Sequence, residues 1–229
     1  IAAGLCEAGT AVVSTKPSAV AGQLVLGIDA AWTAHQPSGI ALVQRQGDAW
    51  SCVALAPSYA SFMALADGIA VDWSARAQGS KPQMTALLRA AEQLSDGRVD
   101  LIAFDMPLSK EPIGHRRQAD REVSRIFGNR GCAVHSPTLQ RPGAIADCIR
   151  QDLEVCGYGL QTAADQPGPG GVIEVYPHVA LLALLERKYR VPYKVSRSLQ
   201  YWRTEHLSAE ERIGRLLTEF GRIRDGLAQ

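Results

Sequence analysis

The sequence predicts an α/β fold built on a mixed β-sheet, and three observations carry this prediction. Short apolar runs bounded by Gly or Pro recur at residues 24–29, 101–105 and 172–176, and such runs are typical of strands buried on both faces. Turn sequences follow the first run closely, which predicts an antiparallel meander. Helical periodicity separates the later runs, and a strand that returns after a helix predicts a crossover in a mixed sheet.

Length and composition are those of an ordinary globular protein. The 229 residues suit one α/β domain or two small ones, with 46% hydrophobic and 21% charged residues. We expect residues 1–23 to be an N-terminal extension without an assigned role and residues 24–229 to form the domain. The formal net charge is +1, so a nucleic-acid or membrane partner has to be argued from a local patch.

Cysteine content and hydropathy predict a cytoplasmic protein with no membrane partner. The five cysteines are odd in number and show no Cys-x-x-Cys spacing, which argues against a zinc cluster or a disulfide framework and favours a reducing cytosol. No apolar run is long enough to span a bilayer. The first residues lack the basic stretch and apolar core of a signal peptide.

The first half of the chain predicts the meander and then a change to helical period. Turns at Pro37–Gly39 and Gln46–Asp48 separate three predicted strands, at residues 24–29, 40–43 and 50–55. Apolar residues with helical spacing then predict two helices, at residues 59–69 and 84–94. The strand at 101–105 follows the second helix.

The second half alternates helices with one further strand. A charged helix is expected over 114–127, ending at Gly128, and another over 144–156. The strand at 172–176 follows a loop rich in Gly and Pro, and Pro177 suits the first turn of the next helix. Ser208 and Glu211 form a capping box that starts the last helix.

Three acids stand on or at the ends of predicted strands: Asp29, Asp105 and Glu174. Burying a carboxylate in a sheet is costly, and such conflicts with local preference tend to mark functional sites. A single aspartate at a strand end more often caps a turn or a helix, whereas a glutamate inside a strand is harder to explain in that way. Because sites in open α/β sheets form beyond the carboxyl ends of strands, we expect the three acids to converge there.

Converging carboxylates repel one another unless they are protonated or bridged by a cation. Their oxygens suit a hard cation, so Mg²⁺ or Mn²⁺ is the expected cofactor and Asp29, Asp105 and Glu174 are the expected catalytic metal ligands. Two such ions can clamp the attacking and leaving oxygens of a phosphoryl displacement. The acids therefore predict phosphodiester or phosphoryl chemistry.

A basic region lies beside these acids in the sequence. Residues 110–150 hold eight Lys and Arg against four Asp and Glu. On the expected helix Arg116 faces Asp120, and Arg121 continues the basic face. Most of these arginines suit a solvated helix face, but Asp120 is a further catalytic candidate, and Arg116 and Arg121 are candidates for binding substrate phosphates.

Two further stretches are candidates for contacts with substrate. Ser136 follows a Gly-containing turn and suits either a phosphate contact or a capped turn. Lys194 stands among aromatic residues, a mixture found on surfaces that stack single-stranded bases, although packing at the edge of the core explains several of these aromatics equally well.

Taken in order, several of these motifs resemble one bacterial and archaeal domain-of-unknown-function family, described as predicted ribonuclease H-like nucleases. The resemblance covers about residues 24–217 and rests on the order and spacing of five segments: Gly27–Trp32, Ser38–Ala41, Phe104–Leu108, Arg116–Arg121 and Ile173–His178. Tyr193 and Lys194 resemble the Tyr-Lys pair of that family.

The resemblance implies a ribonuclease H-like fold: a mixed five-stranded sheet, with its first three strands antiparallel, flanked by helices. It also implies a divalent-metal site in which Asp29, Asp105 and Glu174 match the strand acids. The expected protein is a metal-dependent nuclease acting on DNA or RNA, in which a metal-bound water attacks phosphorus while Arg116 and Lys194 neutralise the substrate.

Two other readings stay open at this point. The related sheet of actin-like proteins and sugar kinases also opens with Gly-Ile-Asp, which suggests a phosphotransferase, although two Gly-rich phosphate loops are missing from the sequence. The family fold usually takes a further acid from a late helix, and Asp225 is a poor substitute for it. This difference allows an inactive nucleic-acid or nucleotide binding module on the same scaffold.

Overall fold

The protein is described by a computed structural model, which covers residues 23–162 and 168–228. Two compact units make up the chain. The sheet unit consists of residues 1–113 and 138–175, and the helical unit of residues 114–137 and 176–229. Except for its last residue, the predicted N-terminal extension lies outside the described residues, and a single domain from residue 24 onward stays a prediction.

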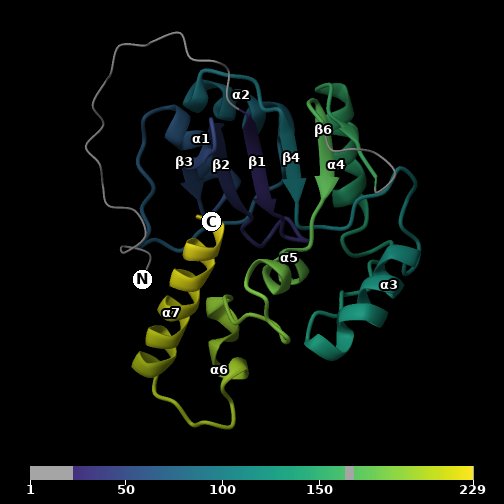
Figure 1. The fold of residues 1–229 in the computed structure, drawn as a ribbon. Helices are drawn as coiled ribbons and strands as arrows, with labels where there is room; N and C mark the ends of the chain where they lie inside the picture. The colour runs from purple at the N-terminus through teal and green to yellow at the C-terminus, as the bar shows by residue number, and fades with distance from the viewer. Residues whose placement is uncertain (1–22, 163–167, 229) are drawn as a thin grey trace. The chain divides into compact units, whose positions relative to one another are not determined.

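Six strands form the sheet, in the order β3-β2-β1-β4-β6-β5. Figure 1 labels β3, β2, β1, β4 and β6 in this order. They are β1 (Leu24–Asp29), β2 (Gly39–Gln46), β3 (Ala49–Ala56), β4 (Leu101–Phe104), β5 (Gly159–Leu160) and β6 (Gly171–Glu174). The first three pair antiparallel, and β4, β6 and β5 continue from β1 in parallel. The predicted mixed sheet with an antiparallel start is therefore confirmed.

The sixth strand, β5, is a correction to the predicted five-stranded sheet. Gly159 pairs with Gly171 and Leu160 pairs with Val172, and the strand is only two residues long. It is held by backbone hydrogen bonds, such as the one from the Gln161 N–H to the Val172 carbonyl at 2.8 Å. A segment this short contains no alternation of apolar side chains, so sequence periodicity does not detect it.

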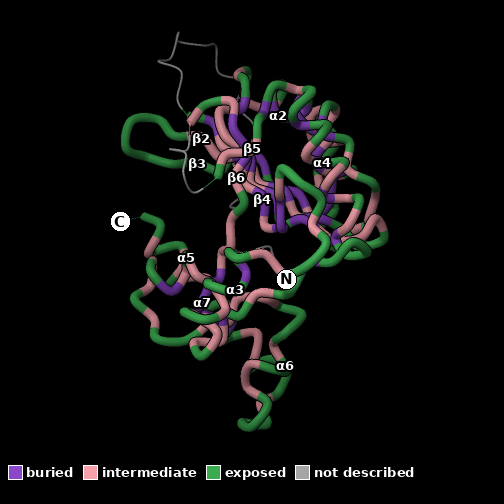
Figure 2. Tube along the Cα trace, turned by 90° about the vertical axis from the view of Figure 1, so that its right-hand side faces the viewer, coloured by how far each residue is buried: buried purple, intermediate pink, exposed green. Residues whose placement is uncertain are grey.

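Helices α1 (Tyr59–Ala66), α2 (Met84–Ser95) and α4 (Ala144–Val155) cover one face of the sheet. The strand residues that point to these helices are buried, as the tube along the sheet shows (Figure 2). The largest of them are Leu26, Ile40, Leu42, Ile102 and Phe104. Alternate residues such as Val25, Gly27 and Ala103 face the other side and are half-buried.

Two close contacts hold the loop that leaves β1. The hydroxyl of buried Ser38 accepts a hydrogen bond from the Ala31 N–H at 3.0 Å. The segment between α1 and α2 crosses the same loop at Gly79, where an added Cβ would lie 2.4 Å from the carbonyl carbon of His35. Only a residue without a side chain fits there, so the conformation of the loop depends on Gly79.

The helical unit contains α3 (Gln118–Phe127), the 3₁₀ turns η1 (Gly128–Arg130) and η2 (Val195–Arg197), and α5 (Pro177–Leu184), α6 (Ser198–Tyr201) and α7 (Ala209–Leu227). The predicted capping box starts α7: the Ser208 hydroxyl accepts from the Glu211 N–H at 3.2 Å, and the Glu211 carboxylate accepts from the Ser208 N–H at 2.7 Å. Within residues 23–162 and 168–228, no helix combines the length and apolar character needed to cross a membrane.

Candidate functional site

Asp29 and Asp105 end two neighbouring parallel strands at the same edge of the sheet. Ile28 is in register with Phe104, and the Asp105 N–H donates to the Ile28 carbonyl at 2.9 Å. The two aspartates are therefore the next pair in register, on strands that lie about 4.8 Å apart. Paired residues of a parallel sheet point to the same face, so both carboxylates leave the sheet on one side. Asp29 is exposed and Asp105 is half-buried.

Small residues surround this pair on its face of the sheet. Gly39 pairs with Asp29 across β2, and a Cβ on Gly39 would stand 3.8 Å from the Asp29 Cβ. Gly27 and Ala103 occupy the preceding row on the same face and are in register with each other. Because these side chains are short or absent, the sheet itself leaves room beside the two carboxylates for a ligand.

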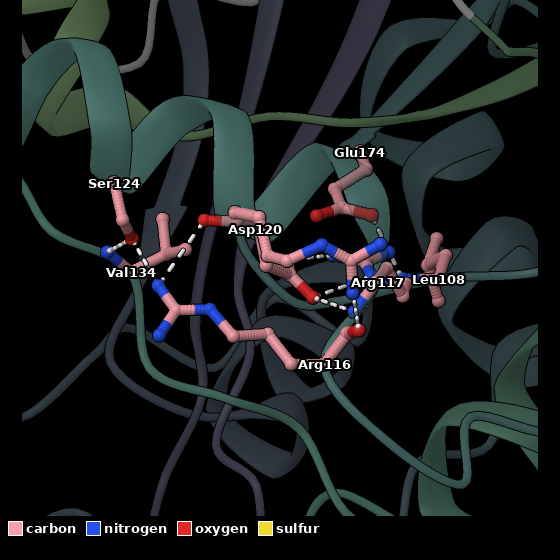
Figure 3. Close-up of polar contacts among 8 residues, drawn as sticks. Leu108, Arg116, Arg117, Asp120, Ser124, Val134 and Glu174 are labelled. Carbon is pink, nitrogen blue, oxygen red and sulfur yellow. Dashed lines mark hydrogen bonds and ion pairs between the residues drawn. The ribbon is translucent and has the colours of Figure 1, made fainter.

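Glu174 lies on β6, one residue short of the level of Asp105. It is in register with Phe104, and alternation along the strand directs its side chain to the face opposite the aspartates. Its Oε2 atom accepts a hydrogen bond from the Leu108 N–H at 3.0 Å, so the carboxylate holds the segment that follows β4 (Figure 3).

The predicted convergence of three acids is not seen among the described residues. No group of three His, Cys, Asp or Glu side chains in this part of the chain could share a metal ion. The structure brings together Asp29 and Asp105 and gives Glu174 a different contact. A direct metal contact for Glu174 stays a prediction.

Arg141 stands at the carboxyl edge of the sheet and was not singled out from the sequence. The Tyr158 hydroxyl, just after α4, donates to the Val99 carbonyl at 2.7 Å, which places the end of α4 at the amino edge of β4. The start of α4 therefore lies at the other edge. Arg141 precedes this start, and its guanidinium carbon is 5.9 Å from the centre of the Trp32 ring. Trp32 follows Asp29 by three residues. The position of Arg141 before a crossover helix was the available sequence clue.

Asp120 stabilises the start of α3 in the helical unit. It is 4% exposed, and its carboxylate accepts from the Arg117 backbone N–H at 2.9 Å and from the Arg117 Nη2 at 2.6 Å. Arg117 has extended backbone angles, φ −73° and ψ 165°, and serves as the N-cap. The helix therefore begins at Gln118, four residues later than predicted, because an acid at its third position caps it there.

Arg116 precedes the helix, so it does not face Asp120 from within one helix as predicted, and its side chain contacts the backbone of Asp120 instead. Its Nη2 donates to the Asp120 backbone carbonyl at 3.2 Å and to the Ser124 hydroxyl. That hydroxyl also accepts from the Val134 N–H at 3.2 Å (Figure 3). Arg121 donates from Nη1 to the Arg116 carbonyl at 2.8 Å. These contacts join α3 to the segment after it; a substrate role for Arg116 and Arg121 stays a prediction.

The other two predicted substrate contacts also lie in the helical unit. Ser136 is exposed. Lys194 is half-buried, with Nζ 5.8 Å from the centre of the Tyr193 ring, and its backbone N–H donates to the Tyr201 hydroxyl at 3.3 Å. Their roles in substrate binding stay predictions.

His178, near the start of α5, is a buried titratable group. It is 4% exposed, and its Nε2 lies 2.6 Å from the Arg190 Nη2. Burial, followed by the positive charges of Arg190, Lys194 and Arg197, lowers the pKa of His178 to about 3. Because a guanidinium only donates, Nε2 is the acceptor, and the neutral ring carries its proton on Nδ1.

Comparison with known proteins gives a family and nothing narrower. The family model described as "Protein of unknown function (DUF429)" matches residues 27–220. No curated protein and no solved structure matches the chain. The matched range includes every residue discussed in this subsection and most of both units. The chain therefore belongs to the DUF429 family.

Proposed function

We propose that the protein is a divalent-metal-dependent nuclease that hydrolyses phosphodiester bonds. The observation that carries the proposal is the pairing of Asp29 with Asp105 at the carboxyl edge of the sheet. The strand order β3-β2-β1-β4-β6 also supports the ribonuclease H-like fold that the sequence resemblance implies, with β5 as an added edge strand.

The donor set at this edge fits Mg²⁺ or Mn²⁺. Mg²⁺ commonly keeps several waters and binds one or two protein carboxylates together with substrate phosphate oxygens, so two aspartates suffice. Gly39 and Gly27 leave space on the same face. Asp29 and Asp105 would hold the ion, which when bound supplies an activated water and offsets charge on the phosphate.

Two other side chains of the sheet unit, Arg141 and Glu174, help to position the substrate. Arg141 places an exposed guanidinium at the carboxyl edge, where it neutralises a phosphate oxygen. Glu174 orders the segment after β4 through Leu108, and exposed Lys110 follows two residues later. In this scheme Glu174 acts as a positioning residue, and its removal lowers activity by loosening that segment.

Substitution of the aspartates tests the proposal. Asp29→Asn and Asp105→Asn should each abolish saturable Mn²⁺ binding, measured by electron paramagnetic resonance, and reduce Mg²⁺-dependent cleavage of a labelled oligonucleotide at least 100-fold, about 3 kcal/mol in barrier. The thermal midpoint should stay near that of the wild type, because both side chains project from strand ends. Asp48→Asn is the matched control: it lies in the turn after β2, at the other edge of the sheet.

Two results would contradict the nuclease proposal. If Asp29→Asn cleaves the oligonucleotide at the wild-type rate, Asp29 has no role in the reaction. A wild-type protein that binds nucleic acid without saturable Mn²⁺ binding would instead be an inactive binding module on the same scaffold.

A further inference from the structure

Charge is divided unequally between the two units. The helical unit holds fifteen Lys and Arg against eight Asp and Glu, a formal net charge of +7. The sheet unit holds nine Lys and Arg against fifteen Asp and Glu, a net charge of −6. An anionic polymer is therefore attracted to the helical unit, although the chain as a whole is almost neutral.

The positive charge is concentrated in residues 187–204. This segment contains six Lys and Arg, four aromatic residues and no Asp or Glu. It runs from the end of α5 through η2 and α6, and the trace around α6 is exposed or half-buried along its length (Figure 2). A basic, aromatic, surface segment is the composition that single-strand binding surfaces use.

Most cations of this segment have no carboxylate partner, unlike many elsewhere in the helical unit. Among the described residues, Arg117, Arg125, Arg187, Arg215, Arg222 and Arg224 form ion pairs within the unit. Over the same described range, none of the other five cations of the segment does so: Lys188, Arg190, Lys194, Arg197 and Arg203. Arg190 contacts the buried ring of His178, whereas Lys188, Arg197 and Arg203 are exposed, so the charges of these three are available to phosphate oxygens.

One aromatic ring of the segment is held as a platform. Tyr189 lies against the backbone of Gly131, where an added Cβ would stand 2.8 Å from the Tyr189 Cζ, yet the residue is 64% exposed. Arg130 fixes the neighbouring backbone by donating from Nε to the Lys188 carbonyl at 3.1 Å and by accepting the Arg190 N–H on its own carbonyl at 2.9 Å. The ring is thus supported from beneath and open above, before any ligand binds.

We propose that residues 187–204 bind single-stranded nucleic acid, with phosphates at the exposed cations Lys188, Arg197 and Arg203 and a base stacked on Tyr189. A duplex keeps its base faces covered, so an exposed ring with flanking cations favours a single strand. The inference rests on the proposed function for its nucleic-acid partner but not on metal binding or cleavage.

Fluorescence anisotropy with two labelled probes, a 20-nucleotide oligodeoxythymidylate and a 20-nucleotide oligouridylate, tests this inference in EDTA. Wild-type protein should bind at least one probe more tightly than a DNA duplex of equal length, and the two probes distinguish DNA from RNA. Asp48→Asn should bind as the wild type does, because the segment lies outside the sheet unit.

Paired variants separate the segment from the general charge of the unit. Lys188→Gln combined with Arg197→Gln should lower the slope of log affinity against log salt by about 1.4, or about 0.7 for each lost phosphate contact. Arg125→Gln combined with Arg224→Gln removes the same charge from two exposed ion pairs and should leave the slope near wild type. Tyr189→Leu should weaken binding about fivefold or more, and Tyr189→Phe should restore it.

The inference is overturned if the two double variants lose affinity equally, if Tyr189→Leu binds as the wild type does, or if the duplex binds more tightly. Failure of the wild type to bind either probe in EDTA also overturns it. That last result leaves Mn²⁺ binding at Asp29 and Asp105 open to separate measurement, so failure of this inference and failure of the metal site are distinguishable.

Discussion

The neutral state of His178 makes the stability of the helical unit depend on pH. The pKa of His178 is lowered from 6.5 to about 3 in the folded chain. Between these values the unfolded chain binds a proton that the folded chain does not. The resulting stability is fully present above pH 6.5 and is lost as the pH falls towards 3.

We expect the free energy of unfolding to fall between pH 7.5 and 5.0 by about 2 kcal/mol more in the wild type than in His178→Leu. Urea denaturation at the two pH values measures this difference. His115→Leu is the control, because His115 is exposed in the same unit, and it should keep the pH dependence of the wild type. Equal pH dependence in His178→Leu and the wild type would show that the buried ring is not responsible.

The two aspartates and Glu174 show what sequence can predict for single residues. Asp29 and Asp105 could be predicted to meet, because each stands at the carboxyl end of a strand. The carboxyl ends of neighbouring parallel strands lie at the same edge of the sheet. The position of Glu174 could not be predicted, because a shift of one residue in register moves a side chain to the other face. The register of β6 against β4 is set by tertiary pairing, which the local sequence does not encode.

At the level of elements, the start of α3 depends on Asp120. Asp120→Asn should lower the free energy of unfolding by about 2 kcal/mol, because it weakens the charged hydrogen bonds from Arg117, the N-cap, whose side chain is only 19% exposed. Urea denaturation measures this loss. Glu122→Gln, which breaks an exposed ion pair with Arg125 in the same helix, should cost less than about 0.5 kcal/mol.

Measuring the cleavage activity of Asp120→Asn distinguishes this structural role from the catalytic role predicted for Asp120. At a temperature where the variant is folded, a structural Asp120 predicts near wild-type cleavage by Asp120→Asn. A large loss of cleavage with unchanged stability would instead support the catalytic role.

The two helix starts differ in how far sequence could locate them. Ser208 and Glu211 form a recognised capping box, and α7 begins where they predict. At α3 the N-cap is Arg117, a residue type that cannot accept the hydrogen bond of a usual cap, and the only clue is the acid three positions later. The charged stretch that predicted the helix begins before this cap, at residues 114–117, so the predicted start was too early.

At the level of the whole molecule, a net charge of +1 conceals two units of opposite sign. Each unit is assembled from two separate stretches of sequence, so a running window of charge mixes them. Residues 110–150, which suggested a basic region beside the acids, include parts of both units. The division of charge follows from the fold and becomes visible only when contacts group the segments.

Because the positive charge is gathered in one unit, we expect the protein to bind a negatively charged resin even at the pH where its net charge is zero. At pH 7.8, the isoelectric point calculated from the sequence, the wild type should be retained on a sulfonate column through its helical unit. The Lys188→Gln and Arg197→Gln double variant should elute at lower salt than the Arg125→Gln and Arg224→Gln double variant. Wild-type protein in the flow-through would contradict an exposed basic surface.

The discontinuity of both units also bears on how the chain is made. During synthesis β4 is complete at Phe104, but its neighbour β6 starts only at Gly171, a delay of roughly 3–13 s at ordinary rates of translation. Until β6 is made, the backbone N–H and C=O groups on that side of β4 lack their partner strand, and α3 is likewise made long before α7. Because neither unit can be completed from one continuous stretch of chain, chaperones that shield nascent strands are expected to raise the yield of folded protein.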